Sequence, residues 1–240
     1  PASFEPAVDY VIAKIPRWPF DKFKGNTGEL GVQMQSTGEV MAIGRTIEES
    51  LLKAIRSLEN KVDHIELESL KKMNEIELMK FISLHTDERI YAIGEALRKG
   101  VTIDELYFLT KIDRFFLEKY NHIIELENEI MKHPMDIDTL RLAKRYGFAD
   151  SYLAKIWNSN YYDIYKLRHD NSIYPVYKMI DTCASEFKSY IPYFYSTYEH
   201  ENESIKSENK KIVVLGSGPI RIGQGVEFDY TTVHAIWGIQ

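Results

Sequence analysis

The residues most able to do chemistry form a glycine-rich turn near the end of the sequence. Gly216, Gly218 and Gly223 follow the apolar run Ile212–Leu215, which is typical of a buried parallel strand. A helix is expected to begin near Gln224. The backbone N–H groups of such a turn and the N-terminus of the helix can bind an anion. The turn is therefore a candidate phosphate site.

The spacing of these glycines differs from both common nucleotide-binding motifs. A dinucleotide fingerprint needs G-x-G-x-x-G, whereas Gly223 stands five residues after Gly218 and Pro219 lacks an N–H group. The G-K-[ST] triplet of a P-loop is absent. The residues alone favour a tight strand–helix turn beside a site that other domains complete. Nucleotide binding by the turn itself is the alternative.

Composition excludes several other classes of protein. The net charge of −6 argues against a nucleic-acid partner, which would require clustered Lys and Arg. No apolar run approaches the roughly 20 residues of a membrane helix, so we expect no membrane partner. The seven histidines show no metal-ligand spacing with Cys183, the single cysteine. We expect Cys183 to be a small buried residue, and no intrachain disulfide is possible.

The middle of the chain, residues 46–198, is predicted to be helical. Thr46–Glu49 and Thr102–Glu105 both have the sequence of a capping box, in which a threonine and a glutamate each bond the backbone N–H of the other. The first opens a helix through about Leu58. Apolar periodicity and stop signals predict further helices over 67–84, 87–99, 102–109, 113–132, 138–146, 150–157 and 161–168.

One pair of these helices, 138–146 and 150–157, resembles a DNA-binding helix–turn–helix. Its second helix carries only one basic side chain, Lys155, in an acidic region. A helical hairpin closed by Gly147 is a general packing device, and we interpret it so.

The flanks of the helical region differ from it in composition. Before it, Tyr10–Ile15 reads as a short strand and Val32–Ile43 as an extended segment. After it, residues 174–198 hold two prolines and many aromatic side chains, which indicates an irregular segment. The charged stretch 199–211 reads as a linker. A last helix is expected over Val226–Ile239.

Two segments resemble one protein family. Gly216–Tyr230 is close to the pattern G-x-G-P-x-R-I-G-Q-G-x-E-F-D-Y, which opens the second synthetase half of the large subunit of glutamine-dependent carbamoyl-phosphate synthetase. Pro175–Ala184 with Tyr195–Glu199 resembles the segment before that half. The weaker matches, to the end of the first ATP-grasp domain and to the helical region, are 1–6, 14–17, 38–45, 113–116 and 147–150. The resemblance covers essentially the whole chain and is weakest over 60–82.

The resemblance implies a mainly α fold with α/β pieces at both ends. Residues 1–45 would be the C-terminal end of the first-half ATP-grasp domain, and 46–198 the helical oligomerisation domain. Residues 199–211 would be a linker, and 212–240 the truncated start of the second-half, Rossmann-like pre-ATP-grasp domain. We expect the chain to be a piece of a longer polypeptide, because a lone strand–helix unit needs further strands to bury its faces.

The resemblance also implies a function. The whole enzyme would be an ATP-dependent C–N ligase making carbamoyl phosphate from bicarbonate, glutamine-derived ammonia and two ATP, for pyrimidine or arginine biosynthesis. ATP, Mg²⁺ (or Mn²⁺) and K⁺ would serve the whole enzyme, and none is expected for this segment. Expected partners are a second copy, a glutamine amidotransferase subunit or domain, and other domains of the large subunit, in the cytoplasm.

The site residues implied by the resemblance fall into two groups, and none is catalytic or a metal ligand. The carbamate tunnel would be lined by Glu227, Met34 and Glu39. The glycine loop near the second synthetase site would comprise Gly216, Gly218, Arg221, Gly223 and Gln224.

The leading hypothesis is an assembly module that links two synthetase halves and carries subunit contacts. A free-standing helical adaptor is one alternative, and nucleotide binding by the Gly216 loop is the other. A reading frame that continues past Gln240 into another ATP-grasp domain would exclude the adaptor.

Overall fold

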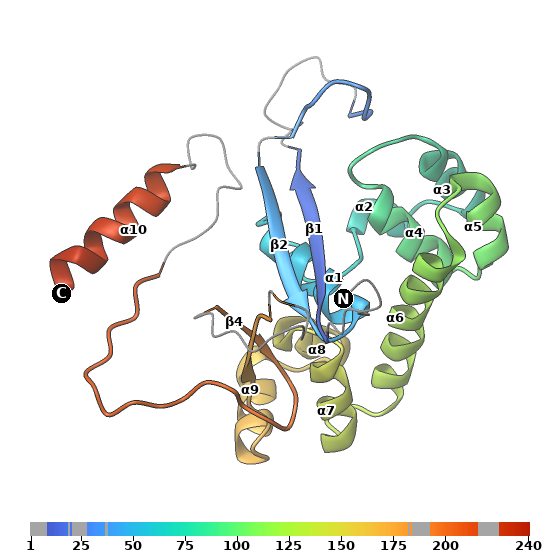
Figure 1. Cartoon of the computed structure of the whole chain (residues 1–240). Helices are drawn as coiled ribbons and strands as arrows, with labels where there is room; N and C mark the ends of the chain where they lie inside the picture. Colours follow the sequence, from blue (N-terminus) through green and yellow to red (C-terminus); the bar gives the residue numbers. More distant parts are fainter. Residues whose placement is uncertain are drawn as a thin grey trace, which may run out of the picture.

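The structure is a computed structural model that describes residues 9–18, 20, 28–36, 38–181, 183, 193–215 and 226–240, without the side chains of 226–229. The helical middle of the chain packs against a strand pair at each end (Figure 1). This arrangement confirms the mainly α prediction. The elements are β1 (Val11–Arg17), β2 (Gly38–Gly44), α1 (Ile47–Ser57), α2 (Glu68–Lys71), α3 (Glu75–Ser83), α4 (Arg89–Arg98), α5 (Ile103–Thr110), α6 (Arg114–Lys132), α7 (Ile137–Arg145), α8 (Asp150–Ile156), α9 (Tyr161–Asp170), β3 (Val176–Met179), β4 (Phe194–Thr197) and α10 (Val226–Ile239).

The first two strands form an antiparallel pair in register from Val11 opposite Gly44 to Arg17 opposite Gly38. One face of the pair packs on α1, where Val40 and Ala42 join a small apolar cluster with Ala54. The other face leaves side chains such as Met41 exposed. The predicted first strand is confirmed but continues through Pro16. An edge strand tolerates proline because the missing N–H donor is not needed for a ladder hydrogen bond on the open side.

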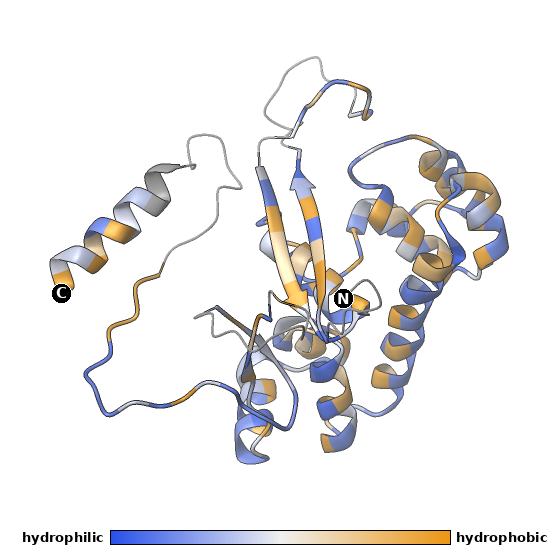
Figure 2. Cartoon of the chain, in the orientation of Figure 1, coloured by the Kyte–Doolittle hydropathy of each residue, from blue (hydrophilic) through white to orange (hydrophobic). Residues whose placement is uncertain are grey.

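A second, larger apolar cluster joins α1 to the other helices up to α9. Apolar and polar residues alternate along these helices, as the orange and blue segments of Figure 2 show. Ile55 of α1, Ile93 of α4 and Ile130 of α6 are buried in this core. The indole Nε1–H of Trp157 donates to the carbonyl of Ile130 (2.8 Å), so this buried polar group is satisfied.

Capping decides where several helices begin. The Thr102–Glu105 capping box is confirmed, with both reciprocal bonds present. The predicted helix 67–84 is two helices, α2 and α3, because Asn74 and Glu77 form a second capping box between them. At α1 the Thr46 hydroxyl accepts from the N–H of Glu49 as predicted. The Glu49 carboxylate, however, accepts from the N–H of Arg45 rather than from Thr46.

Two predictions near the C-terminal end are wrong. Residues 174–198 were expected to be irregular, yet β3 and β4 pair antiparallel from Val176 opposite Thr197 to Met179 opposite Phe194. The run 212–215 was expected to be a buried strand, yet it forms none and its side chains are largely exposed. The described chain offers no strand beside it to pair with.

The predicted helix over 226–239 is confirmed as α10. Figure 1 draws it apart from the body formed by the other elements. Cys183 is half-buried rather than buried. None of the helices in the described ranges is long and apolar enough to span a bilayer.

Among the glycines of the described ranges, Gly147 is predicted to tolerate a side chain poorly. Its φ is +86°, and a Cβ there would lie 2.9 Å from the Cα of Glu49, which is backbone and cannot move aside. Gly147→Ala should lower the free energy of unfolding by about 3 kcal/mol, combining left-handed strain with overpacking. Urea unfolding followed by circular dichroism measures the loss.

Gly100→Ala is the matched control, because Gly100 has φ +90° but nothing within 4 Å of its Cβ position. It should cost only about 1 kcal/mol, from backbone strain alone. Equal losses for the two variants would contradict the packing role of Gly147.

Candidate functional site

The residues expected to line the tunnel and the glycine loop are only partly described. Met34 is 90% exposed, and Glu39 lies on the open face of the β1–β2 pair, where it pairs with Lys14 (2.8 Å). Glu227 falls in α10, with its side chain outside the described residues. The loop residues Gly216, Gly218, Arg221, Gly223 and Gln224 lie outside the described ranges. The structure therefore leaves the tunnel and loop roles as predictions.

The side chains that the structure does bring together are buried ion networks, and the first centres on Glu49. This residue is fully buried at the start of α1. One carboxylate oxygen accepts from the N–H of Arg45 (2.7 Å) and from the hydroxyl of Thr197 (3.0 Å). The other pairs with the ammonium of Lys53 (2.7 Å). The carboxylate thus joins the end of β2, helix α1 and strand β4.

Lys53 extends this network to both strand pairs. Its ammonium also donates to the carbonyl of Ile43 in β2 (2.9 Å) and to that of Ser196 in β4. Burial lowers the pKa of Lys53, and the hydrogen bond to Glu49 offsets only part of that effect. Arg56, one turn further along α1, donates to the carbonyl of Gly147 (2.6 Å) and so ties in the α7–α8 turn.

Glu48, the neighbour of Glu49, points to α6 instead. Its carboxylate accepts from Nδ1–H of His122 (2.7 Å) and faces the ammonium of Lys119 (3.6 Å). Burial alone would raise the pKa of Glu48, but the His122 hydrogen bond and the Lys119 charge outweigh it, so that pKa is lowered. Two successive acidic residues therefore hold α1 between the strand pairs and α6.

The second network lies between α4, α6 and the loop before α2. Glu127 of α6 accepts from Nε2–H of His64 (3.0 Å) and from two nitrogens of Arg98, Nε at 2.9 Å and Nη2 at 2.8 Å. His64 also stacks on the ring of Tyr152 of α8, with centroids 3.9 Å apart. Burial alone would raise the pKa of Glu127, but these hydrogen bonds lower it to about 2.

His64 stays neutral in this network. Its burial lowers its pKa more than the bond to Glu127 raises it, and the nearby Arg98 charge lowers it further. A neutral imidazole that donates through Nε2–H suits a carboxylate that can only accept. The single negative charge of Glu127 is thus matched by the guanidinium of Arg98.

The third network fixes α7 to α8 and α9. The ammonium of Lys144 donates to Asp150 (2.7 Å) and to the carbonyl of Phe148 (2.8 Å). Arg168 of α9 donates two hydrogen bonds to the other oxygen of Asp150, at 3.0 and 3.1 Å. Burial lowers the pKa of Lys144 to about 8 despite its bond to Asp150. These contacts position helices and leave no free acid or base, so we interpret all three networks as structural.

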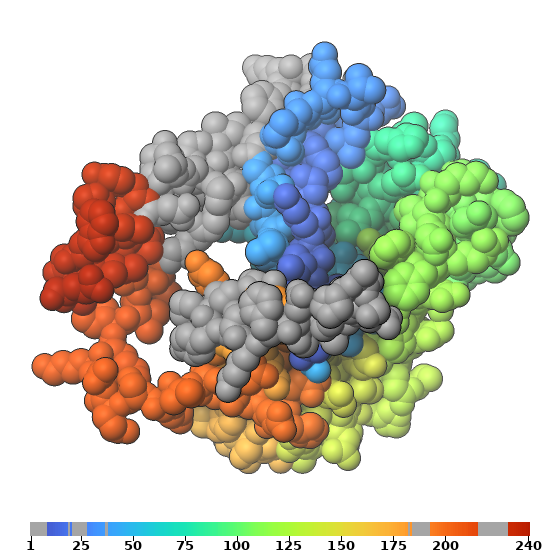
Figure 3. All heavy atoms as spheres, viewed as in Figure 1, coloured from blue at the N-terminus to red at the C-terminus, as the bar shows by residue number. Residues whose placement is uncertain are grey.

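α5 and α6 carry an aromatic surface of rings left to solvent in the helical body. Phe108 is 66% exposed, Phe115 49% and Phe116 50%. The guanidinium of Arg114 lies 3.7 Å from the centroid of Tyr107, and the ammonium of Lys111 lies 5.5 Å from that of Phe108. This flank is drawn in light green in Figure 3. Exposed aromatic groups flanked by cations are typical of protein interfaces.

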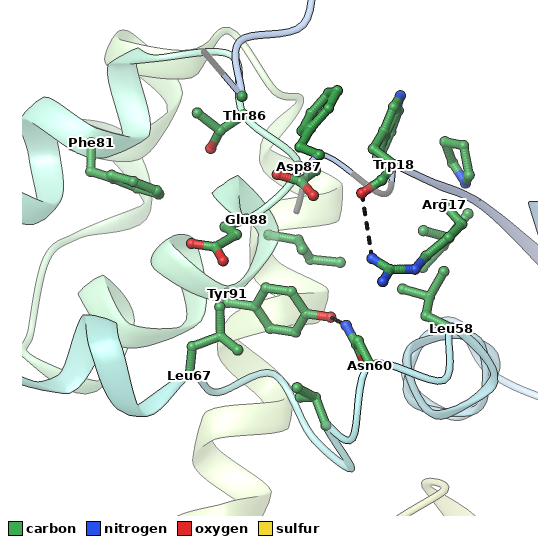
Figure 4. A pocket seen from close by; sticks show the side chains of 16 residues that line it. Arg17, Trp18, Leu58, Asn60, Leu67, Phe81, Thr86, Asp87, Glu88 and Tyr91 are labelled. Atoms are coloured by element: carbon green, nitrogen blue, oxygen red, sulfur yellow. Dashed lines mark hydrogen bonds between the residues drawn. The ribbon is translucent and has the colours of Figure 1, made fainter. Parts of the chain in front are cut away.

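A cavity of about 450 Å³ lies where the end of β1 meets α3 and α4 (Figure 4). Its walls are mostly apolar and include Trp18, Leu58 and Phe81. Its polar lining includes Glu88 and Tyr91 at the start of α4. No motif in the sequence indicated this cavity, because its walls come from segments far apart in the chain.

The fold and its three networks define a class of protein: a helical scaffold braced by buried ion pairs. A family model described as carbamoyl-phosphate synthetase large chain, oligomerisation domain, matches residues 39–172, more than half of the chain. A second, the carbamoyl phosphate synthase preATP-grasp domain, matches residues 208–240. The chain therefore belongs to the carbamoyl-phosphate synthetase large-chain family, which is a family of ligases.

The sequence held a signal for the second network that we did not use. Glu127 stands on the inward stripe of α6, four residues after Ile123 and three before Ile130. A carboxylate at such a position must find buried partners. Glu49 was singled out only as a cap, and its long-range partner Thr197 carries no local signal.

Glu127 predicts an acid-sensitive component of stability. Its pKa is about 2 in the folded chain, below the ordinary glutamate value of 4.5. The stabilisation is thus fully present above pH 4.5 and is lost as pH falls toward 2. The difference between the folded pKa and the ordinary glutamate pKa corresponds to ~3 kcal/mol in the free energy of unfolding. Urea unfolding at a series of pH values should show this loss in the native sequence and a smaller one in Glu127→Gln.

Glu118→Gln is the matched control, because Glu118 lies exposed on the same helix. It should keep both the stability and the acid dependence of the native chain. If Glu127→Gln kept the full acid dependence, another carboxylate would be its source.

Proposed function

We propose that this chain acts as an assembly module, holding the two synthetase halves of a carbamoyl-phosphate synthetase large subunit and self-associating. The match of residues 39–172 to the oligomerisation-domain family is the observation that carries the proposal. The buried networks support it, since they brace α1, α6 and the strand pairs with contacts that need no ligand.

The surface we assign to self-association is the aromatic surface of α5 and α6. Phe108 and Phe116 expose rings that water solvates poorly, and burying them against a second copy would be favourable. Aromatic and Arg side chains are the residues most enriched in the energetic centres of interfaces. Arg114, already stacked on Tyr107, adds such a group to the same surface.

For the whole large subunit, we propose the synthesis of carbamoyl phosphate from bicarbonate, glutamine-derived ammonia and two ATP in the cytoplasm. A glutamine amidotransferase subunit or domain would supply the ammonia, and ATP with Mg²⁺ and K⁺ would be the cofactors. Among the described residues no group of three His, Cys, Asp or Glu side chains could hold a metal ion. We therefore assign no metal ligand to this part of the chain.

We also propose that Glu39, Met34 and Glu227 contribute to the carbamate tunnel. The position of Glu39 supports this, since the open face of the β1–β2 pair leaves it accessible to a neighbouring domain. An enclosed route would protect an intermediate that reacts with water.

Self-association is predicted to depend on concentration and to be indifferent to nucleotide. Light scattering of the 240-residue chain over a concentration series should show a dimer or larger species, unchanged by ATP and Mg²⁺. The double variant Phe108→Ser, Phe116→Ser should weaken the association at least about tenfold, because each buried aromatic contributes a kcal/mol or more at an interface.

Ile205→Ser is the matched control, since Ile205 is 89% exposed in the 199–211 stretch, outside the aromatic surface. It should associate like the native chain. A strict monomer whose stability rises with ATP would overturn the assembly role and assign nucleotide binding to the chain instead.

A further inference from the structure

Arg56 of α1 is a half-buried cation that forms no ion pair with any described residue. Its Nη1 group donates to the carbonyl of Gly147 (2.6 Å), which is its one hydrogen bond within the described ranges. Its Nε and Nη2 groups are not sealed from solvent, so a ligand can reach them. Burial lowers the pKa of Arg56, because the charge is held away from bulk water.

Two other half-buried arginines use the same edge of the guanidinium to bind a carboxylate. Arg98 donates to Glu127 from Nε (2.9 Å) and Nη2 (2.8 Å). Arg168 donates to Asp150 from the same two nitrogens, at 3.1 and 3.0 Å. Two parallel N–H donors match the planar shape of a carboxylate. The corresponding edge of Arg56 is left without one.

The acids whose charges act on Arg56 are bonded elsewhere. Asp63 is exposed and accepts from the hydroxyl of Ser151 (2.6 Å). Glu49 is held in the first buried network and Asp150 in the third. No described carboxylate therefore lies within ion-pair distance of Arg56.

Arg56 lines a cavity of about 490 Å³ between β2, α1 and β4. Among the described residues of its lining, the one other charged side chain is Lys53, and none is acidic. The apolar part of the lining includes Met41 of β2 together with Phe194 and Tyr195 of β4. The volume lies within the range of small-molecule sites. A cation and apolar walls without an acid suit a ligand that carries one negative group on an apolar body.

We propose that this cavity binds a small organic carboxylate, an acid group carried on an aromatic or aliphatic body. The carboxylate accepts from Nε–H and Nη2–H of Arg56, while the body packs against Met41, Phe194 and Tyr195. Lys53 adds only its charge, because its three N–H groups already have acceptors. The inference does not rest on the assembly role, because the cavity is separate from the aromatic surface of α5 and α6.

Phenylacetate is the probe that tests the proposal on the full chain, and phenylacetamide is its uncharged match of the same shape. Isothermal titration calorimetry should show saturable one-site binding of phenylacetate at millimolar concentration or below, about tenfold tighter than that of the amide. Absence of saturable binding in that range, or equal binding of the acid and the amide, overturns the proposal.

Two variants that place a new carboxylate on the surface locate the site. Met41 is 63% exposed, so Met41→Glu should fold, and its carboxylate should compete for Arg56 and weaken phenylacetate binding about tenfold. Ile76→Glu makes the same charge change at an 81% exposed position on α3, outside the cavity, and should bind like the native chain. Equal weakening by both would assign the binding to net charge and overturn the site.

Arg56→Lys tests the fork itself. A lysine keeps the positive charge and can still donate to the carbonyl of Gly147, but it offers no pair of parallel donors. The variant should keep the native circular dichroism spectrum and bind phenylacetate severalfold more weakly. Unchanged phenylacetate binding by the folded variant would contradict the role of Arg56.

Discussion

The fold depends on one buried carboxylate, that of Glu49. A charge without solvent must be paired and hydrogen-bonded, and Glu49 is held by the N–H of Arg45 just after β2, the ammonium of Lys53 in α1 and the hydroxyl of Thr197 in β4. Backbone is packed against it as well. A Cβ at Gly44 would lie 2.9 Å from its carboxylate oxygen, and one at Gly147 2.9 Å from its Cα. If the strand pairs left α1, Glu49 would lose the hydrogen bonds from the Arg45 N–H and the Thr197 hydroxyl and keep only its ion pair with Lys53.

The other two networks apply the same constraint within the helical body, and together they explain which surfaces remain available. Glu127 fixes α6 to α4, and Asp150 fixes α8 to α7 and α9. Because these buried ion pairs fix the helices to one another, the exposed rings of α5 and α6 lie on a rigid surface. A rigid surface loses little conformational entropy when it binds, which suits the assembly role that we propose.

The helices were predictable because apolar period and capping are local signals. Thr102 with Glu105, and Gly147 after α7, marked real boundaries. The β3–β4 pair was missed because Pro175 and the many aromatic residues indicated an irregular segment, and each strand is only four residues long. The run 212–215 was assigned as a strand from its apolar residues alone, whereas a strand also needs a partner. The cavity and the partners of Glu49 depend on contacts between distant segments, which one sequence does not display.

The most direct test of this account is hydrogen–deuterium exchange of Glu49→Gln, resolved by peptide. The substitution keeps the shape of the side chain and leaves the half-buried ammonium of Lys53 without its counter-charge, a change that costs at most about 3–5 kcal/mol. The account predicts that β2, the α7–α8 turn and β4 lose protection together, while the Glu127 region of α6 keeps more of its own. Loss of protection confined to α1, or none at all, would contradict the central role of Glu49.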